Sequence, residues 1–316
     1  MKKTENTNHI EGYVYEHELN LKVSGPNSKN PGVSFINGEL KVATDDELTN
    51  IVPIHFSYVT ATTKNGNPNA TYTALKAIID GNVSTVMKVG KNNAGMVRID
   101  STVGVNDFYT NNDGKVELVS AMRSEGGFVH VCNALSEDLK KRNQFKCDIL
   151  ITNVSRTEGN EETGTKDKVT VKGYIFDFRN AFYPATFVTY DEAAMNYYES
   201  LEVSPKNPVF TKLWGNQVAT TIKKEIKTDS AFGEAYVKEV TNTRKEFVIS
   251  GGQLEPYAYD DETTITEAEV AKGLADREVH LAEVKAAYEE YMASKAQVGR
   301  PVATPAPSTD SQGFNF

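Results

Sequence analysis

The sequence predicts a mostly β protein made of two similar units in tandem, followed by a helix and a low-complexity tail. Two observations predict the paired units. Alternating or β-branched runs, bounded by Gly, Asn, Asp and Pro, recur through residues 11–250, as expected of strands. One helical stretch follows the third run in each half, so the order β-β-β-α-β-β occurs twice. A third observation is the change in composition after residue 250, which separates the β region from the rest of the chain.

The first unit is expected to span residues 11–133. Its five strands are predicted at Tyr13–Val23, Val33–Ala43, Ile51–Ala61, Val97–Tyr109 and Leu118–Cys132. Between the third and fourth strands, apolar residues at helical spacing predict a helix over 70–80, which Gly81 ends.

The second unit is expected to span residues 145–252 with the same order. Its strands are predicted at Asp148–Glu158, Lys168–Phe178, Phe182–Thr189, Val209–Lys227 and Ala235–Ser250, and its helix near Asp191–Glu202. Residues also match between the units: Gly38 with Gly173, Pro53 with Pro184, Phe56 with Phe187, Gly104 with Gly215, Arg123 with Arg244, Glu125 with Glu246, and Phe128 with Phe247. These matches indicate an internal duplication, with two unrelated β domains as the alternative.

The C-terminal region is predicted to be a helical segment over 262–298 and a disordered tail over 299–316. A capping box at Thr264 and Glu267, or at Thr266 and Glu269, opens the helix. Apolar residues follow near heptad spacing, interrupted by Arg277. The helix is expected to dock on the body or to pair with another subunit. The tail is too rich in Pro, Ala, Ser and Thr to form a core.

Composition excludes several classes of protein. The chain has 316 residues, 39% of them hydrophobic and 24% charged, with a mean hydropathy of -0.46, and no apolar run approaches the length of a membrane span. The N-terminal residues contain no apolar stretch typical of a secretory signal, so a cytoplasmic location is expected. Cys132 and Cys147 have no CxxC spacing, which argues against a disulfide framework and a zinc site.

The acidic charge lies mainly at the C-terminal end. The formal net charge is -9, and residues 251–316 hold 12 acidic and 5 basic side chains, so residues 1–250 are nearly neutral. A cationic groove on the β region therefore remains compatible with the overall charge. Such a groove would allow a polyanionic partner.

Five strands with a helix between the third and fourth are the layout of the OB-fold, a small barrel that binds oligonucleotides or oligosaccharides. Glycines inside strands fit the sharp bends of such a barrel. With its tandem OB-like units, acidic helical segment and low-complexity tail, the chain resembles phage-type single-stranded DNA-binding proteins. The resemblance implies a protein that coats single-stranded DNA during replication or recombination, inside the host cytoplasm if phage-encoded.

Proteins that hold single strands need aromatic faces for bases and cations for phosphates. Tyr174, Phe176 and Phe178 recur at period two, which places them on one strand face with Lys172, and Arg179 follows. They form either a stacking platform or part of the barrel core. The match of Gly38 with Gly173 favours the outer face, and it brings Lys41 to the same face in the first unit.

Other binding candidates are less organised. Phe108 and Tyr109 lie where a hairpin begins, and Lys212 neighbours Trp214, the one tryptophan, for which a buried position is the alternative. Further candidates are Arg123 and Arg244, each of which either contacts a phosphate or pairs with the glutamate two residues later.

No motif organises a catalytic or metal site, so we expect no enzyme activity, no metal and no cofactor. The expected partners are single-stranded DNA and, through the tail, replication or recombination proteins. Bacterial single-stranded DNA-binding proteins end in a similar acidic, Phe-terminated tip, which implies partner-binding roles for Asp310, Phe314 and Phe316. Here Asn315 replaces the proline of that pattern. A structural or virion-assembly β protein and an RNA-binding regulator are the rival functions.

Overall fold

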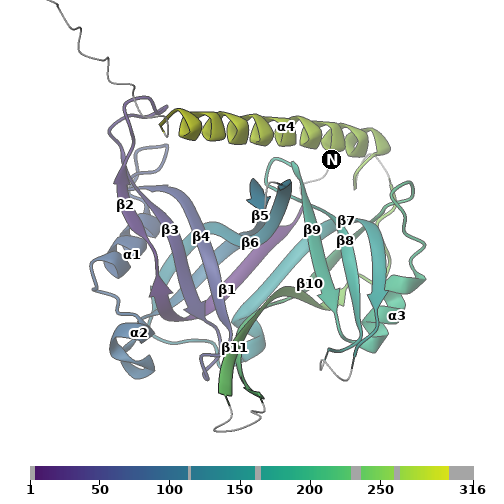
Figure 1. Ribbon diagram of the computed structural model, residues 1–316, viewed down its shortest axis with the longest axis horizontal. Helices are drawn as coiled ribbons and strands as arrows, with labels where there is room; N and C mark the ends of the chain where they lie inside the picture. Colours follow the sequence, from purple (N-terminus) through teal and green to yellow (C-terminus); the bar gives the residue numbers. More distant parts are fainter. Residues whose placement is uncertain (1–3, 113–114, 161–164, 229–235, 260–263, 299–316) are drawn as a thin grey trace, which may run out of the picture.

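A computed structural model describes residues 4–112, 115–160, 165–228, 236–259 and 264–298. These residues are mostly β: they form one large sheet, accompanied by a long C-terminal helix (Figure 1). Within these ranges, no helix combines the length and the apolar character needed to cross a membrane. The tail predicted over 299–316 lies outside the described residues.

The first half of the chain follows the predicted order of elements. Its strands are β1 (Asn6–His17), β2 (Asn20–Val23), β3 (Ser34–Ala43), β4 (Ile51–Thr60), β5 (Met96–Asn112) and β6 (Lys115–Cys132). Its helices are α1 (Ala70–Ile79) and the short turns α2 (Val86–Val89) and η1 (Lys91–Asn93). The prediction of a single strand over 13–23 is wrong, because this part of the chain forms two strands, β1 and β2. Residues from Asn6 onward also join β1, although asparagine is a poor strand former.

The second half repeats that order. After the short turn η2 (Leu139–Lys141), its strands are β7 (Asn143–Thr157), β8 (Lys168–Phe176), β9 (Phe182–Thr189), β10 (Val209–Thr228) and β11 (Tyr236–Gly252). Helix α3 (Glu192–Ser200) lies between β9 and β10, and α4 (Glu267–Val298) follows the last strand. Phe178 lies beyond the end of β8, which corrects the strand predicted over 168–178.

The strands of each half pair in a closed circuit. The strand order of the sheet is β10-β11-β9-β8-β7-β1-β5-β6-β4-β3-β2, with additional pairings β1–β3 and β10–β7. Hydrogen-bonded neighbours therefore run through β1-β3-β4-β6-β5 and back to β1, and through β7-β8-β9-β11-β10 and back to β7. In the first circuit β4 and β6 pair in parallel, and in the second circuit the equivalent strands β9 and β11 do the same. The other pairs in both circuits are antiparallel.

Backbone hydrogen bonds also join the two circuits to each other. Strand β1 also pairs antiparallel with β7, with Asn6 opposite Cys147 and Ile10 opposite Asn143. One sheet therefore continues through both halves of the molecule.

Two matched glycines allow close strand contacts in both circuits. A Cβ on Gly38, whose φ is +124°, would lie 2.1 Å from the carbonyl oxygen of Glu18. A Cβ on Gly173 would lie 2.1 Å from the carbonyl oxygen of Leu150. Both glycines also lie beside register shifts of the sheet. Their predicted role in bending strands is therefore supported, because no other residue avoids these contacts.

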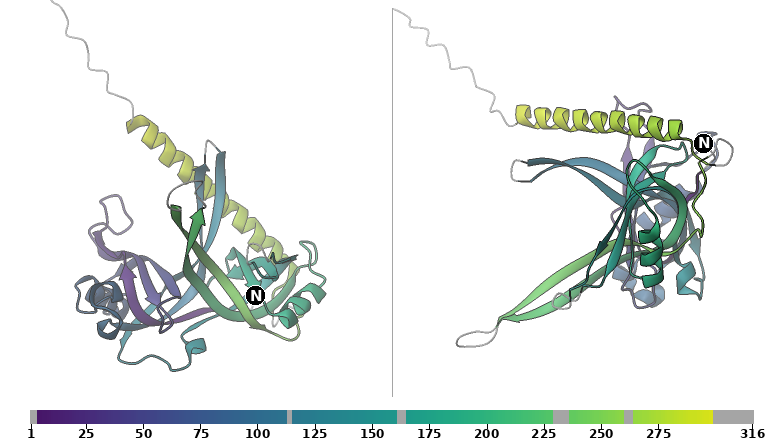
Figure 2. Two further views of the ribbon diagram at one scale, coloured as in Figure 1. Left: turned by 60° about the horizontal axis from the view of Figure 1, so that its bottom comes forward. Right: turned by 90° about the vertical axis from the view of Figure 1, so that its right-hand side faces the viewer.

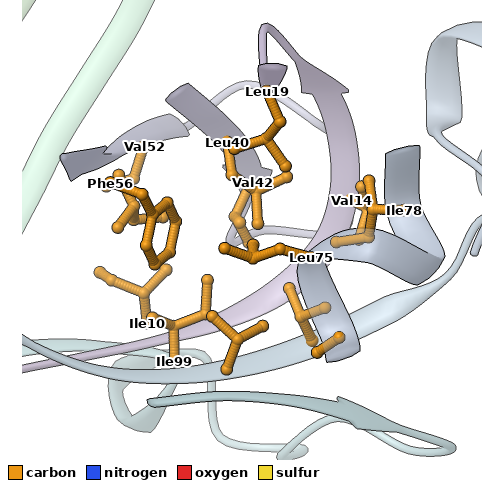
Figure 3. Close-up of a cluster of buried hydrophobic side chains, with 14 of the residues drawn as sticks. Ile10, Val14, Leu19, Leu40, Val42, Val52, Phe56, Leu75, Ile78 and Ile99 are labelled. Carbon is orange, nitrogen blue, oxygen red and sulfur yellow. The ribbon is translucent and has the colours of Figure 1, made fainter. Parts of the chain in front are cut away.

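Each half has its own hydrophobic cluster. In the first half, Leu75 of α1 lies beside Val42 and Ile78 lies beside Val14, in a cluster that includes Ile10, Phe56 and Ile99 of the strands (Figure 3). In the second half, the cluster consists mainly of residues of the second circuit and of α3, among them Phe145, Phe187, Met195, Tyr198 and Phe247. The match of Phe128 with Phe247 is wrong as a structural equivalence, because Phe128 is 70% exposed and Phe247 is buried.

A third cluster lies on the outer face of the second circuit. It contains Leu150, Phe176, Phe182 and Phe210, and the chain after β11 covers them with Ile265. Val270 and Leu274 of α4, with Tyr257, pack against the same cluster. The C-terminal region therefore docks on the body, which was one of the two expected arrangements.

Helix α4 also contacts the first half. Of the two expected capping boxes, the second forms: the Thr266 N–H donates to Glu269, and the Glu269 N–H donates to the Thr266 hydroxyl.

Farther along α4, Arg277 donates to both carboxylate oxygens of Asp107 in β5, at 2.5 and 2.6 Å. Both side chains are at most 5% exposed. Arg277, which interrupts the heptad pattern, is thus an anchor of the helix.

Two long hairpins leave the body on the same side (Figure 2, right). They are formed by β5 with β6 and by β10 with β11, and α4 runs beside the first of them. The ring of Tyr288 in α4 lies 5.7 Å from the ring of Tyr109 in β5.

Buried side-chain hydrogen bonds join the two halves, and we call Asn8, Ser124, Asn143 and Gln217 the amide network. The Gln217 amide donates to Asn8 at 2.9 Å and to the Ser124 hydroxyl at 2.8 Å. Asn143 donates to the carbonyl oxygen of Gln217 at 2.7 Å and accepts from its N–H at 3.0 Å. All four residues are at most 6% exposed. Because water cannot replace these partners, the network favours one arrangement of the halves.

We expect Gln217→Ala to lower the free energy of unfolding by about 1–3 kcal/mol for each buried group left without a partner. Urea unfolding measures this loss. Asn216→Ala is the matched control, because this neighbouring side chain makes no hydrogen bond among the described residues. Equal losses in both variants would contradict a special role for the network.

The Asp107–Arg277 pair predicts an acid-sensitive contribution to stability. Burial alone would raise the pKa of Asp107, but hydrogen bonds from Arg277 and Ser120 outweigh it and lower the pKa. The pair therefore stabilises the fold above the unfolded pKa of about 3.9, and this stabilisation is lost as pH falls through the lower folded pKa. We expect Asp107→Asn to remove that part of the pH dependence in urea unfolding.

Candidate nucleic-acid interface

A groove of about 650 Å³ lies between the two halves. The outer face of β3 and β4 contributes Glu39 and Pro53, and β6, β10 and β11 complete the lining with β8 and β9. In Figure 1, β3 and β4 lie on the left and β8 and β9 on the right. The groove residues of β8 and β9 alternate in sequence with core residues: Lys168, Thr170, Pro184, Thr186 and Val188.

Arg123 lines this groove, and Arg244 directly precedes the lining residue Lys245 in β11. Each arginine pairs with a glutamate. Arg123 Nη2 lies 2.9 Å from Glu125 Oε1, and Arg244 Nε lies 2.5 Å from Glu246 Oε2. The ion-pair alternative for both arginines is therefore observed. The two arginine side chains remain partly exposed, at 25% and 41%.

The pair in the second half belongs to a larger cluster. Burial alone would raise the pKa of Glu246, but hydrogen bonds from Arg244 and Tyr190 lower it. The Arg244 guanidinium also lies over the Tyr190 ring, 4.6 Å from its centroid. Lys168 Nζ lies 3.5 Å from the same carboxylate. Glu246 therefore stays ionised and holds two cations at the edge of the groove.

Two lysines offer unneutralised charge. Lys245 lines the groove, and Lys172 lies on the outer face of β8 opposite the groove residue Thr186. Both are exposed, and neither forms an ion pair within the part of the chain that the structure describes. Lys172 was predicted from the sequence, whereas Lys168 and Lys245 were missed. The alternation Lys168, Thr170, Lys172 along β8 could have revealed the first of them.

Lys41 lies on the outer face of the first circuit but is already paired. Its ammonium is 3.0 Å from Glu18 Oε1 and 3.1 Å from Glu16 Oε2. The hydrogen bond to Glu18 is the main reason that its pKa is raised. A phosphate at Lys41 would therefore compete with two carboxylates.

The predicted aromatic triplet does not form one platform. Tyr174 and Phe176 do lie on the outer face of β8, yet Phe176 is 0% exposed because the C-terminal segment covers it. The expectation that Phe176 stacks a base is therefore wrong. Tyr174 is half-buried beside the same cluster. Phe178 is 79% exposed in the turn after β8, with the Arg179 guanidinium 4.9 Å from its ring centroid.

The remaining candidates lie apart from the groove. Phe108 is 40% exposed on the first hairpin, whereas Tyr109 packs against α4. Lys212 is held by Glu5 at 2.8 Å. Trp214 is 39% exposed, so the alternative of a buried indole does not hold. Neither Lys212 nor Trp214 lines the groove. The three predicted tail residues, Asp310, Phe314 and Phe316, lie outside the described residues.

A family model named YorF matches residues 4–286, which include both strand circuits and most of α4. The chain belongs to the YorF family. No curated protein matches the sequence.

Among solved structures, the chain is similar to a deletion mutant of the single-stranded DNA-binding protein from Thermus aquaticus. The sequences are 8% identical, the TM-score is 0.45, and the match covers 83% of this chain and 100% of the other. A TM-score this low does not establish a shared fold, and we draw nothing from the likeness.

We expect Phe176→Ala to lower the free energy of unfolding by about 3–5 kcal/mol, because it leaves a cavity under the C-terminal segment. Phe178→Ala should change it by less than about 0.5 kcal/mol, since that ring is exposed. Thermal unfolding of the two variants checks this difference. A small loss for Phe176→Ala would show that the third cluster contributes little to stability.

Proposed function

We propose that the protein binds single-stranded DNA in the groove between its halves, through two OB-fold barrels formed by the two strand circuits. The pairing order supports this assignment. In an OB-fold, five strands close a partly open barrel with a helix between strands three and four, and the ligand crosses strands two and three. The equivalent strands here are β3 with β4 and β8 with β9.

The observation that carries the proposal is that both of these faces line the same groove. A strand lying there would contact residues of both barrels at once. Lys168, Lys172 and Lys245 would bind phosphates, together with the exposed parts of Arg123 and Arg244. The side chains between them are small or partly apolar, such as Thr170, Pro184 and Val188, which leaves room for bases.

Coating and protecting single-stranded DNA during replication or recombination is the biological role we propose. It requires no catalysis, and we propose a binding protein rather than an enzyme. Among the described residues, no three His, Cys, Asp or Glu side chains gather in a way that could hold a metal ion. Recruitment of partner proteins by the tail stays a prediction.

Fluorescence anisotropy with labelled oligo(dT) of about 30 nucleotides, enough to span two OB-folds, tests the proposal. We expect tight binding that salt weakens and much weaker binding to duplex DNA. Lys172→Ala and Lys245→Ala should each reduce the slope of log K against log salt by about 0.7, the value for one phosphate contact on a single strand.

Lys206→Ala is the matched control, because Lys206 is also exposed and unpaired within the described ranges but lies outside the groove. Its slope should equal that of the wild type. Equal effects of all three variants, or equal affinity for duplex DNA, would contradict the groove as the binding site. Stronger binding of oligo(rU) than of oligo(dT) would favour RNA as the ligand.

A further inference from the structure

A second hollow, of about 840 Å³, lies next to Trp214. We call it the Trp214 cleft. It shares no lining residue with the groove, and its lining includes Leu139, Lys140, Gln144, Lys146 and Asn216. The amide network lies between the two hollows: Asn143 lines the cleft, its hydrogen-bonding partner Gln217 lines the groove, and both side chains are buried.

The indole of Trp214 lies over the backbone at Gly251. Its cross-strand neighbours are Gly251 in β11 and Lys146 in β7. A Cβ on Gly251 would lie 2.3 Å from the indole Nε1, so the ring occupies the space that any larger residue would fill. Because Trp214 is still 39% exposed, part of its aromatic surface remains open to the cleft.

The cleft also offers the polar groups that a nucleotide needs. Lys140 is exposed and forms no ion pair among the described residues. The Lys146 side chain is 46% exposed, with its ammonium 3.2 Å from Glu5 Oε1. Gln144 and Asn216 supply amides that can donate to and accept from base edges. The volume falls within the usual range of about 300–1,000 Å³ for small-molecule sites.

We propose that the Trp214 cleft is a second nucleotide-binding site, in which a base of the bound single strand stacks on Trp214 and its phosphates contact Lys140 and Lys146. This inference rests on the proposed function and extends the strand beyond the groove. A strand long enough to leave the groove reaches the cleft, whereas a short strand occupies the groove alone.

Intrinsic fluorescence reports on this cleft directly, because Trp214 is the one tryptophan of the chain. We expect oligo(dT) of about 30 nucleotides to quench the emission and to protect the indole from acrylamide. An oligo(dT) of about 8 nucleotides, within the site size of one OB-fold, should do neither at saturation. Anisotropy of the labelled oligonucleotides measures saturation independently.

Two variants of Trp214 distinguish the loss of base stacking from a loss of folding. Trp214→Ala should weaken binding of the long oligonucleotide at least about fivefold, the loss expected for one stacked base, and leave the short one unchanged. Trp214→Phe should stay within about threefold of the wild type, since it keeps an aromatic face.

Long-strand binding that leaves both the emission and acrylamide access unchanged would overturn the inference and leave the groove intact. Equal loss of short and long binding in Trp214→Ala, with Trp214→Phe equally weak, would also overturn it. If neither oligonucleotide binds, the proposed function itself fails, and the inference fails with it.

Discussion

The arrangement of the molecule depends on the amide network between its halves. Hydrogen bonds are directional, and a buried amide without a partner costs about 1–3 kcal/mol, so a small rotation of one half would break several bonds at once. The groove inherits this constraint, because one wall belongs to the first circuit and the other to the second. The amide network therefore restrains the position of one wall relative to the other.

The C-terminal helix adds a second constraint. Glycine in a helix costs about 1 kcal/mol relative to alanine, yet Gly273 lies inside α4. A Cβ there would lie 2.4 Å from the Phe182 ring, so the glycine lets the helix approach the third cluster closely. From that position Arg277 reaches Asp107 on the first hairpin. The helix thus links a hairpin of the first half to the outer face of the second.

Local pattern was enough to predict most elements, because strand periodicity and helix caps depend on neighbouring residues. The order of elements and the role of Gly38 and Gly173 follow from such signals. The failures involve contacts between distant parts of the chain. Phe176 has the parity of an outer-face residue, but it is buried in the third cluster, which the chain after β11 covers with Ile265. Likewise, sequence spacing does not show which binding candidates come together, and the fold places Trp214 and Lys212 outside the groove.

The pairing of β1 with β7 distinguishes this molecule from proteins whose domains are connected only by a flexible linker. When two binding domains are joined by a flexible linker, the second domain binds the ligand at an effective concentration that is set by the length of the linker. Here backbone hydrogen bonds between β1 and β7 join the two halves, so a ligand bound in the proposed groove would meet a preorganised surface and would not have to order one half against the other. The proposed ligand would then contact both faces in one step, and lengthening the 133–142 connection would leave its affinity unchanged.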